Sequence, residues 1–423
     1  MEENKSTDLA KKALQLGILF MAFHVAFSFF RANLTLGITS LLGFVMKDLE
    51  IGIGQAGYLY QLPSTIMGIG MLFGSIIIDK WGTYKTFVIG IVVTALSGIV
   101  TFFAKGSFTL LIISRIVLGA SSAITYPVVM TIVAERFHNQ KQRAMASAVV
   151  QSTNCFTNVM TQRISVPLFM ALGNNYNNLF GIWGLGCVVC LVIFGVFDRS
   201  SDAFFKDFNK QFTAESKAIA AEANEVPGSS ILKAIKIRKV WSAVIGFTGM
   251  TWLYTMYMTY LPTILKTAHG MSPAEASNTT SIINTVGIIV CLLTGYMIKK
   301  TKDFKPLMVL FTTTLTVGGI LAMVVKPGFG MTLSMVLIGI GWFCYIPVIN
   351  TAVMMTEGVT PKIFAAATAV WTVLGCVLSL LIPSLFATLS ASMGMQKAVI
   401  ILSLGGLIAI GGSLYWPSYK KDK

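Results

Sequence analysis

Twelve apolar runs, each long enough to cross a lipid bilayer, divide this chain into two groups of six. The first group falls at about 13–43, 52–78, 84–105, 107–135, 144–171 and 178–198, and the second at about 238–266, 274–298, 305–325, 330–356, 361–390 and 396–416. Of the 423 residues, 55% are hydrophobic and 12% are charged, a balance that a soluble protein could not bury. The sequence therefore predicts an all-α polytopic membrane protein with twelve transmembrane helices.

The distribution of basic residues sets the expected orientation of these helices. The net charge is +15, and most of the 32 Lys and Arg residues fall on the side of the membrane that holds both termini. By the positive-inside rule this side is the cytoplasm, so we expect a multi-pass protein of the plasma membrane with both termini cytoplasmic. The basic excess is explained by topology, and nucleic acid is not an expected partner.

One long polar segment separates the two groups of helices. We expect residues 1–198 to form an N-terminal six-helix half, residues 199–237 to form a cytoplasmic linker, and residues 238–423 to form a C-terminal six-helix half.

The fourth run of each half carries the same landmarks. Gly119 and Pro127 recur in the second half as Gly339 and Pro347, both displaced by the same distance along the chain, which we call the repeat offset. A shared offset of this kind indicates an internal duplication. The halves match in shape but not in charge, because Arg115 is replaced by a methionine at the equivalent position.

The loop SIIIDKWGTYK, between the second and third runs, resembles a signature of the major facilitator superfamily. Ser75, Asp79, Lys80, Gly82 and Lys85 match the pattern of a small residue, three apolar positions, Asp, a base, any residue, Gly and further bases. The stretch FRANLTLG in the first run also resembles the organic-anion branches of this family. The resemblance implies the major facilitator fold, with two pseudo-symmetric six-helix halves, and transport by alternating access.

Two arginines are embedded in the apolar runs, Arg31 in the first and Arg115 in the fourth. An arginine near the middle of a membrane costs roughly 3 kcal/mol, which favours a polar cavity over the lipid. No Asp or Glu lies deep in any run to pair with them. Unpaired guanidinium groups suit a carboxylate or another oxyanion, so both residues are candidates for substrate binding. The alternative is that both are structural and that the solute is neutral or cationic.

Other polar and aromatic residues are candidates for the same cavity. Ser122 and Tyr126 share a helical stripe with Arg115, and the fifth run carries a stripe of Gln151, Asn154 and Asn158 that also includes Ser147 and Gln162. In the second half the candidates are aromatic, Tyr257 foremost, with Trp252, Tyr254, Tyr260, Trp342 and Tyr345 besides. A cationic wall facing an aromatic one would suit a small organic anion with an apolar or planar part.

Proton coupling and gating have their own candidates. His24 lies seven residues before Arg31, on the same helix face, and could carry a proton. The family resemblance implies that Asp79 holds the cytoplasmic face shut, with Lys85 or Arg136 completing the gate. Thr360 and the proline after it predict the start of a helix, as an N-cap and a first-turn residue.

No enzyme signature, nucleotide-binding loop or metal-ligand spacing occurs in the sequence, and we expect no cofactor and no metal. The predicted function is a secondary active or facilitative transporter that moves a small organic anion, working as a monomer in the lipid bilayer. A membrane sensor built on a transporter-like fold is the alternative from another functional class.

Overall fold

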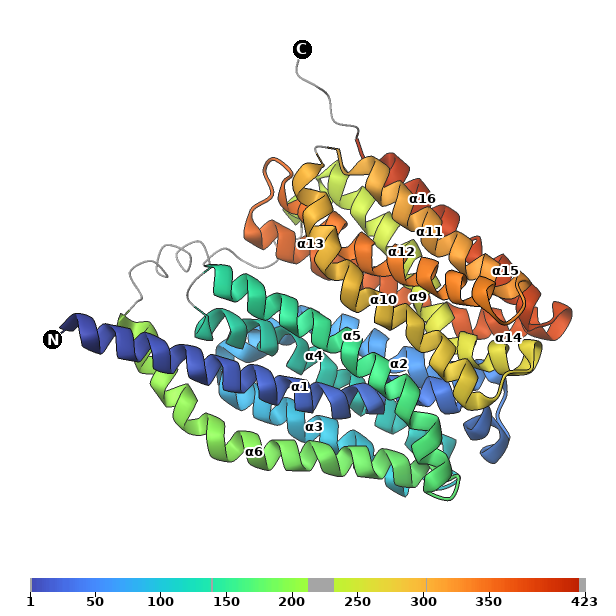
Figure 1. Cartoon of the computed structure of the whole chain (residues 1–423), viewed down its shortest axis with the longest axis horizontal. Helices are drawn as coiled ribbons and strands as arrows, with labels where there is room; N and C mark the ends of the chain where they lie inside the picture. Colours follow the sequence, from blue (N-terminus) through green and yellow to red (C-terminus); the bar gives the residue numbers. More distant parts are fainter. Residues whose placement is uncertain (1, 138–139, 212–231, 302, 418–423) are drawn as a thin grey trace, which may run out of the picture.

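The computed structural model describes residues 2–137, 140–211, 232–301 and 303–417, and their regular elements are helices (Figure 1). The first half contains α1 (Glu2–Asp48), α2 (Ile53–Trp81), α3 (Thr83–Phe103), α4 (Phe108–Arg136), α5 (Gln140–Ala171) and α6 (Tyr176–Gln211). The second half contains α9 (Arg238–His269), α10 (Pro273–Lys300), α11 (Lys305–Val324), α12 (Phe329–Met354), α13 (Pro361–Ser379), α14 (Leu381–Met393), α15 (Met395–Ser403) and α16 (Gly406–Tyr415). Because α13 continues into α14, and α15 into α16, the described residues cross the bilayer in the two six-pass groups that the sequence predicts.

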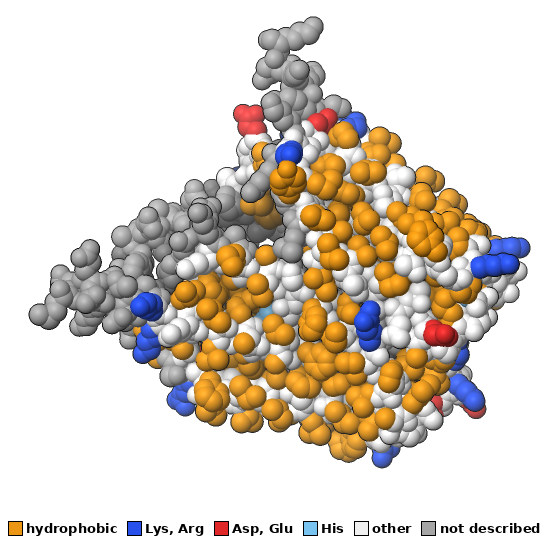
Figure 2. All heavy atoms as spheres, viewed as in Figure 1, with side chains coloured by type: hydrophobic (Ala, Val, Ile, Leu, Met, Phe, Trp, Pro, Cys, Tyr) orange, Lys and Arg blue, Asp and Glu red, His pale blue; other side chains and the backbone are white. Residues whose placement is uncertain are grey.

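Eight of these passes in the described part of the chain are long and apolar enough to span a membrane by composition alone. The other four are α2, α5, α9 and α10, and all four pack at the interface between the halves. Apolar side chains are spread over the face seen in Figure 2, as expected of a surface that contacts lipid. The predicted all-α polytopic fold is confirmed.

The two halves repeat one another closely in the structure. Helix α10 begins at the position that the repeat offset assigns to the start of α2, and α12 begins directly beside the position assigned to the start of α4. A Cβ placed on Gly119 would lie 2.8 Å from the carbonyl oxygen of Pro63, and one placed on Gly339 would lie 2.6 Å from that of Ile283. Pro63 and Ile283 are themselves related by the repeat offset, so the same glycine lets the same pair of helices approach closely in each half.

The halves are closed against each other at one end and separated at the other. We call the end at which α1 begins the terminal face; the ribbons of the two halves diverge toward it and converge at the far end (Figure 1). At the far end, side-chain hydrogen bonds join α5 and the C-terminal part of α1 to α10. We call this contact the seam, and it consists of Ser40, Asn158, Gln162 and Arg163 from the first half and Ser277, Ser281 and Asn284 from the second.

Helix boundaries agree with the local chemistry of the chain. Thr360 caps α13, since its hydroxyl accepts a hydrogen bond from the backbone N–H of Ile363 at 3.4 Å, as predicted. Helix α6 extends past residue 198, the expected end of the first half. There Phe205 packs on Ala13, so the start of the expected linker is docked against α1.

Candidate functional site

A cavity of about 400 Å³ lies between the halves, on the terminal-face side of the seam. Helices α5, α9, α10 and α12 form its walls. Its lining comprises Ala148, Gln151, Ser152, Asn154, Cys155, Asn158, Tyr254, Cys291, Trp342, Phe343, Ile346, Pro347 and Asn350. This volume lies in the range of small-molecule sites, and the lining combines apolar surface with a few amides, as such sites usually do.

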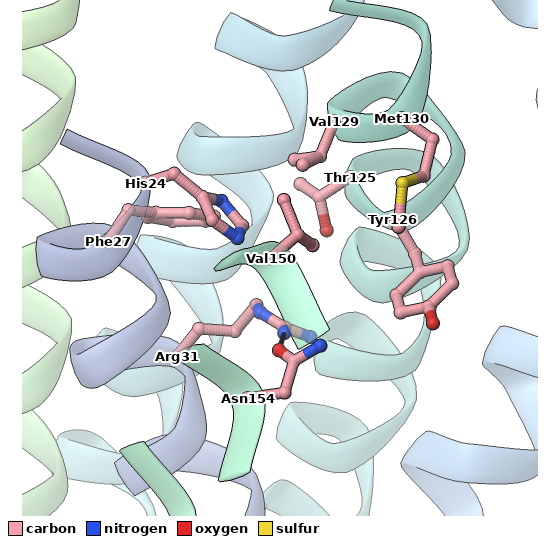
Figure 3. Close-up of a pocket in the computed structure, with 9 residues that line it drawn as sticks. All are labelled: His24, Phe27, Arg31, Thr125, Tyr126, Val129, Met130, Val150 and Asn154. Carbon is pink, nitrogen blue, oxygen red and sulfur yellow. Dashed lines mark hydrogen bonds between the residues drawn. The ribbon is translucent and has the colours of Figure 1, made fainter. Parts of the chain in front are cut away.

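A narrower recess opens beside this cavity within the first half (Figure 3). Helix α1 contributes His24, Phe27 and Arg31, helix α4 contributes Thr125, Tyr126, Val129 and Met130, and helix α5 contributes Val150 and Asn154. The recess holds only about 10 Å³, room for about one water molecule. Asn154 lines both spaces, so the recess and the cavity meet at this residue.

Arg31 lines the recess, and the residue as a whole is partly exposed. Its Nη2 donates a hydrogen bond to Oδ1 of Asn154 at 3.4 Å, the dashed line in Figure 3. Among the described residues, one ion pair is formed, between Arg136 and Asp198. Arg31 therefore has no carboxylate partner within the described part of the chain. A planar group with five N–H donors and one weak amide partner retains most of its hydrogen-bonding capacity.

Arg115 lies elsewhere, in the packed interior of the first half. Its Nη1 donates to the carbonyl oxygen of Leu34 at 2.6 Å, and its Nη2 donates to the hydroxyl of Thr101 at 3.1 Å. Its guanidinium also lies 4.9 Å from the ring centroid of Phe180, and the side chain is 1% exposed. Met335, the repeat counterpart of Arg115, is likewise fully buried. The geometry therefore gives Arg115 a packing role joining α1, α3 and α6 to α4, and does not bring it to the cavity.

The polar stripe on α5 divides between two tasks. Gln151 and Asn154 line the cavity, whereas Gln162 is fully buried in the seam, where its Oε1 accepts from Nδ2 of Asn284 at 3.0 Å. Asn158 serves both, since it lines the cavity and donates to Oδ1 of Asn284 at 3.4 Å. Along this side of α5, the residues nearer the terminal face line the cavity, and the residues nearer the far end belong to the seam.

The remaining substrate-site candidates have mixed outcomes. Tyr126 lines the recess, but Ser122 is buried and lies outside the lining of both spaces. Tyr257 points into the second half, where its hydroxyl lies 2.8 Å from that of Ser403. Tyr254 lies three residues earlier on α9, so its side chain leaves the helix in a different direction. It lines the cavity in place of Tyr257. There its ring stacks on Trp342, with centroids 4.2 Å apart and planes 5° apart.

The coupling candidate, His24, is 4% exposed and lines the recess with Arg31. Its Nε2 lies 3.3 Å from the hydroxyl of Ser28, while Nδ1 is buried without a hydrogen-bond partner among the described residues. The imidazole ring therefore borders the recess and has one long hydrogen bond, with Ser28. The role of His24 in proton coupling stays a prediction.

Two of the three gate candidates, Lys85 and Arg136, have side chains that the structure describes. The side chain of Asp79 lies outside the described residues, and Lys85 is exposed. Arg136 is buried and forms an ion pair with Asp198 of α6 at 2.6 Å, inside the first half. Its guanidinium also lies 4.6 Å from the ring centroid of Phe20. In the present arrangement Arg136 holds α1, α4 and α6 together instead of bridging the halves.

Sequence reasoning missed several residues that the structure places at the site. Asn284 is the centre of the seam, and Ile346 and Asn350 line the cavity. The repeat offset could have found one of them, because Ile346 corresponds to the candidate Tyr126, and Asn350 follows one helical turn later. The offset gives no such signal for Asn284, because its counterpart in the first half is Ser64, which is not among the sequence candidates for the site.

Comparisons with known proteins agree with this architecture. The sequence profile described as Major Facilitator Superfamily matches residues 18–383. The uncharacterized transporter YybO of Bacillus subtilis (strain 168) is 25% identical over 280 residues, which span 63% of this chain and 62% of that protein.

Among solved structures, the chain is similar to a bacterial homologue of the human lysosomal transporter Spinster in an inward-facing and unoccupied conformation (TM-score 0.73, 14% identity, 96% of this chain and 97% of that one). It is also similar to the xylose transporter XylE from E. coli in a partially occluded inward-open conformation (TM-score 0.70, 14% identity, 96% of this chain and 99% of that one). At these identities the structures support the fold alone. Because the profile covers most of the sequence, the chain belongs to the major facilitator superfamily, a family of membrane transporters and not of enzymes.

Proposed function

We propose that this protein is a secondary transporter of a small organic anion and that the cavity between the halves is its substrate site. The observation that carries the proposal is Arg31, a guanidinium group that faces the recess with one weak amide partner at 3.4 Å. A carboxylate entering from the cavity would reach Asn154 first and could then bond to Arg31 in a two-pronged arrangement. Such a ligand would supply a negative charge beside Arg31, which the described residues do not provide.

The opposite wall of the cavity supports a ligand with a planar part. The stacked rings of Tyr254 and Trp342 lie across from α5, and a flat apolar group could pack on them while its carboxylate reaches Asn154. A volume of about 400 Å³ suits a molecule of the size of a substituted aromatic acid. Neither wall offers an acidic side chain among the described residues, which disfavours a cationic solute.

The arrangement of seam and cavity supports alternating access. In the present conformation the seam closes the far end, and the cavity lies toward the terminal face. We propose that the terminal face is cytoplasmic, in the plasma membrane, and that this conformation is therefore inward-facing. Opening to the other side would require α5 and α10 to part at the seam while the halves close at the terminal face.

Counterflow into proteoliposomes, with a panel of radiolabelled carboxylates that includes benzoate, tests this function. We expect uptake of at least one planar carboxylate, its loss in Arg31→Gln, and poor rescue in Arg31→Lys, because an ammonium group cannot form the paired bonds of a guanidinium. Arg199→Gln is the matched control, since the side chain of Arg199 is exposed. Equal uptake of a carboxylate by wild type and Arg31→Gln would instead give Arg31 a structural role, and no uptake of any carboxylate by wild type would favour a neutral or cationic solute.

A further inference from the structure

Two cysteines from opposite halves meet at the end of the seam. Cys155 lies on α5 and Cys291 on α10, both line the cavity, and their thiols lie close enough to interact. Their placement follows from helix register: each lies seven residues from a seam residue, Cys155 from Gln162 and Cys291 from Asn284. Because α5 and α10 run in opposite directions here, two helical turns, or about 10 Å, carry both chains to the same level.

We propose that Cys155 and Cys291 form a redox-sensitive modification site, at which a small organic disulfide is reduced and the two thiols become a disulfide that links the two halves. This inference is independent of the identity of the transported solute. It requires a reagent small enough to enter a cavity of about 400 Å³.

The exposure of the two thiols sets the order of the reaction. Cys291 is partly exposed, whereas Cys155 is 3% exposed. The Cys291 thiolate attacks one sulfur of the reagent, forms a mixed disulfide and releases the first small thiol. The Cys155 thiolate then attacks the Cys291 sulfur, which forms the bond between the cysteines and releases the second small thiol. The protons lost by the two cysteines are taken up by the two released thiolates, so the reagent is reduced as the pair is oxidised.

The bond would connect α5 and α10 where the seam gives way to the cavity. Access from the far side requires these helices to part at Gln162 and Asn284, two turns away. A disulfide between Cys155 and Cys291 would restrict the separation of α5 from α10 until a reductant cleaves the disulfide. The other described cysteines are differently placed: Cys187 and Cys190 lie in α6, buried inside the first half. Cys344 lies in α12 and Cys376 in α13, both in the same half as Cys291.

A cross-linking experiment on the full chain in proteoliposomes tests the proposal. A protease site is inserted between α6 and α9, the protein is treated with 4,4′-dithiodipyridine, and it is then cleaved and run on a denaturing gel without reductant. We expect the wild-type halves to migrate as one species and to separate after dithiothreitol is added. In Cys155→Ser the halves should separate without reductant, and mass spectrometry should find a pyridinethiol adduct on Cys291.

Further variants make the result specific. Cys291→Ser should also give separate halves, and Cys187→Ser, the matched control, should behave like wild type. Oxidised wild-type halves that separate without reductant would overturn the proposal, and so would a disulfide between Cys291 and Cys344, which lies within one half. Peptide mapping of the wild-type product distinguishes these outcomes without reliance on any variant that folds poorly.

Discussion

Asn284 makes more of the seam's hydrogen bonds between two side chains than any other described residue. Its truncation should therefore favour the state that is open at the far end over the state that is open at the terminal face. Its side chain is fully buried, donates to Gln162 at 3.0 Å, and accepts from Asn158 and from the hydroxyl of Tyr254, both at 3.4 Å. Side-chain hydrogen bonds inside membrane proteins average about 0.6 kcal/mol each. Only the bonds to Gln162 and Asn158 cross the seam, because Tyr254 belongs to the same half as Asn284. We take the sum of these two as about 1 kcal/mol, which corresponds to a roughly five-fold change in an equilibrium constant. Asn284→Ala should therefore increase the population open at the far end about five-fold.

The labelling rate of a cysteine introduced at the seam measures this shift. Ala276, on α10, is 1% exposed, so Ala276→Cys should react with a membrane-impermeant maleimide only when the seam opens. We expect about five-fold faster labelling when Asn284→Ala is added. Asn33→Ala is the matched control, because Asn33 is also fully buried but donates to the carbonyl of Phe29 in its own helix. Unchanged labelling, or an equal increase in both variants, would refute the assignment of Asn284 to the seam.

Other predictions concern charged or titratable side chains inside the first half. Arg115→Gln should lower the free energy of unfolding by about 2 kcal/mol, since it removes buried bonds from a charged donor, and thermal unfolding in detergent should show this; an unchanged melting temperature would contradict the packing role. Asp198→Asn should destabilise by about 3 kcal/mol because it leaves Arg136 buried and uncompensated, and adding Arg136→Gln should cost less than the sum of the two single changes; strictly additive losses would show that the pair is not coupled. If His24 carries the coupling proton, then His24→Gln should abolish the stimulation of uptake by a pH jump while leaving counterflow intact; retained stimulation would assign coupling to another group.

The helices and their duplication could be predicted from the sequence because both rest on local signals. Apolar runs of spanning length define the passes, and the offset between Gly119 and Gly339 reappears as equivalent helix contacts. The N-cap at Thr360 is equally local, since it depends on one hydroxyl and the backbone three residues on.

The roles of individual side chains could not be predicted to the same depth. Arg31 and Arg115 are both arginines inside apolar runs, and only the packing of the neighbouring helices decides which one is enclosed by Leu34 and Thr101. Similarly, Tyr254 and Tyr257 are three residues apart, and the rotation of α9 within the bundle sends one to the cavity and the other to Ser403. Such choices depend on contacts between residues far apart in the chain.

The bonds of Arg115 have a consequence for how the protein is made. An arginine near the middle of a helix opposes insertion by roughly 3 kcal/mol while it is unpartnered. Its acceptors, the carbonyl of Leu34 on α1 and the hydroxyl of Thr101 on α3, both precede it in the chain. Because synthesis proceeds from the N-terminus, those two helices are made before α4, so we expect the guanidinium to find its acceptors already present. Moving Arg115 to an earlier helix would remove that advantage, because the charge would enter the membrane before anything could bond to it.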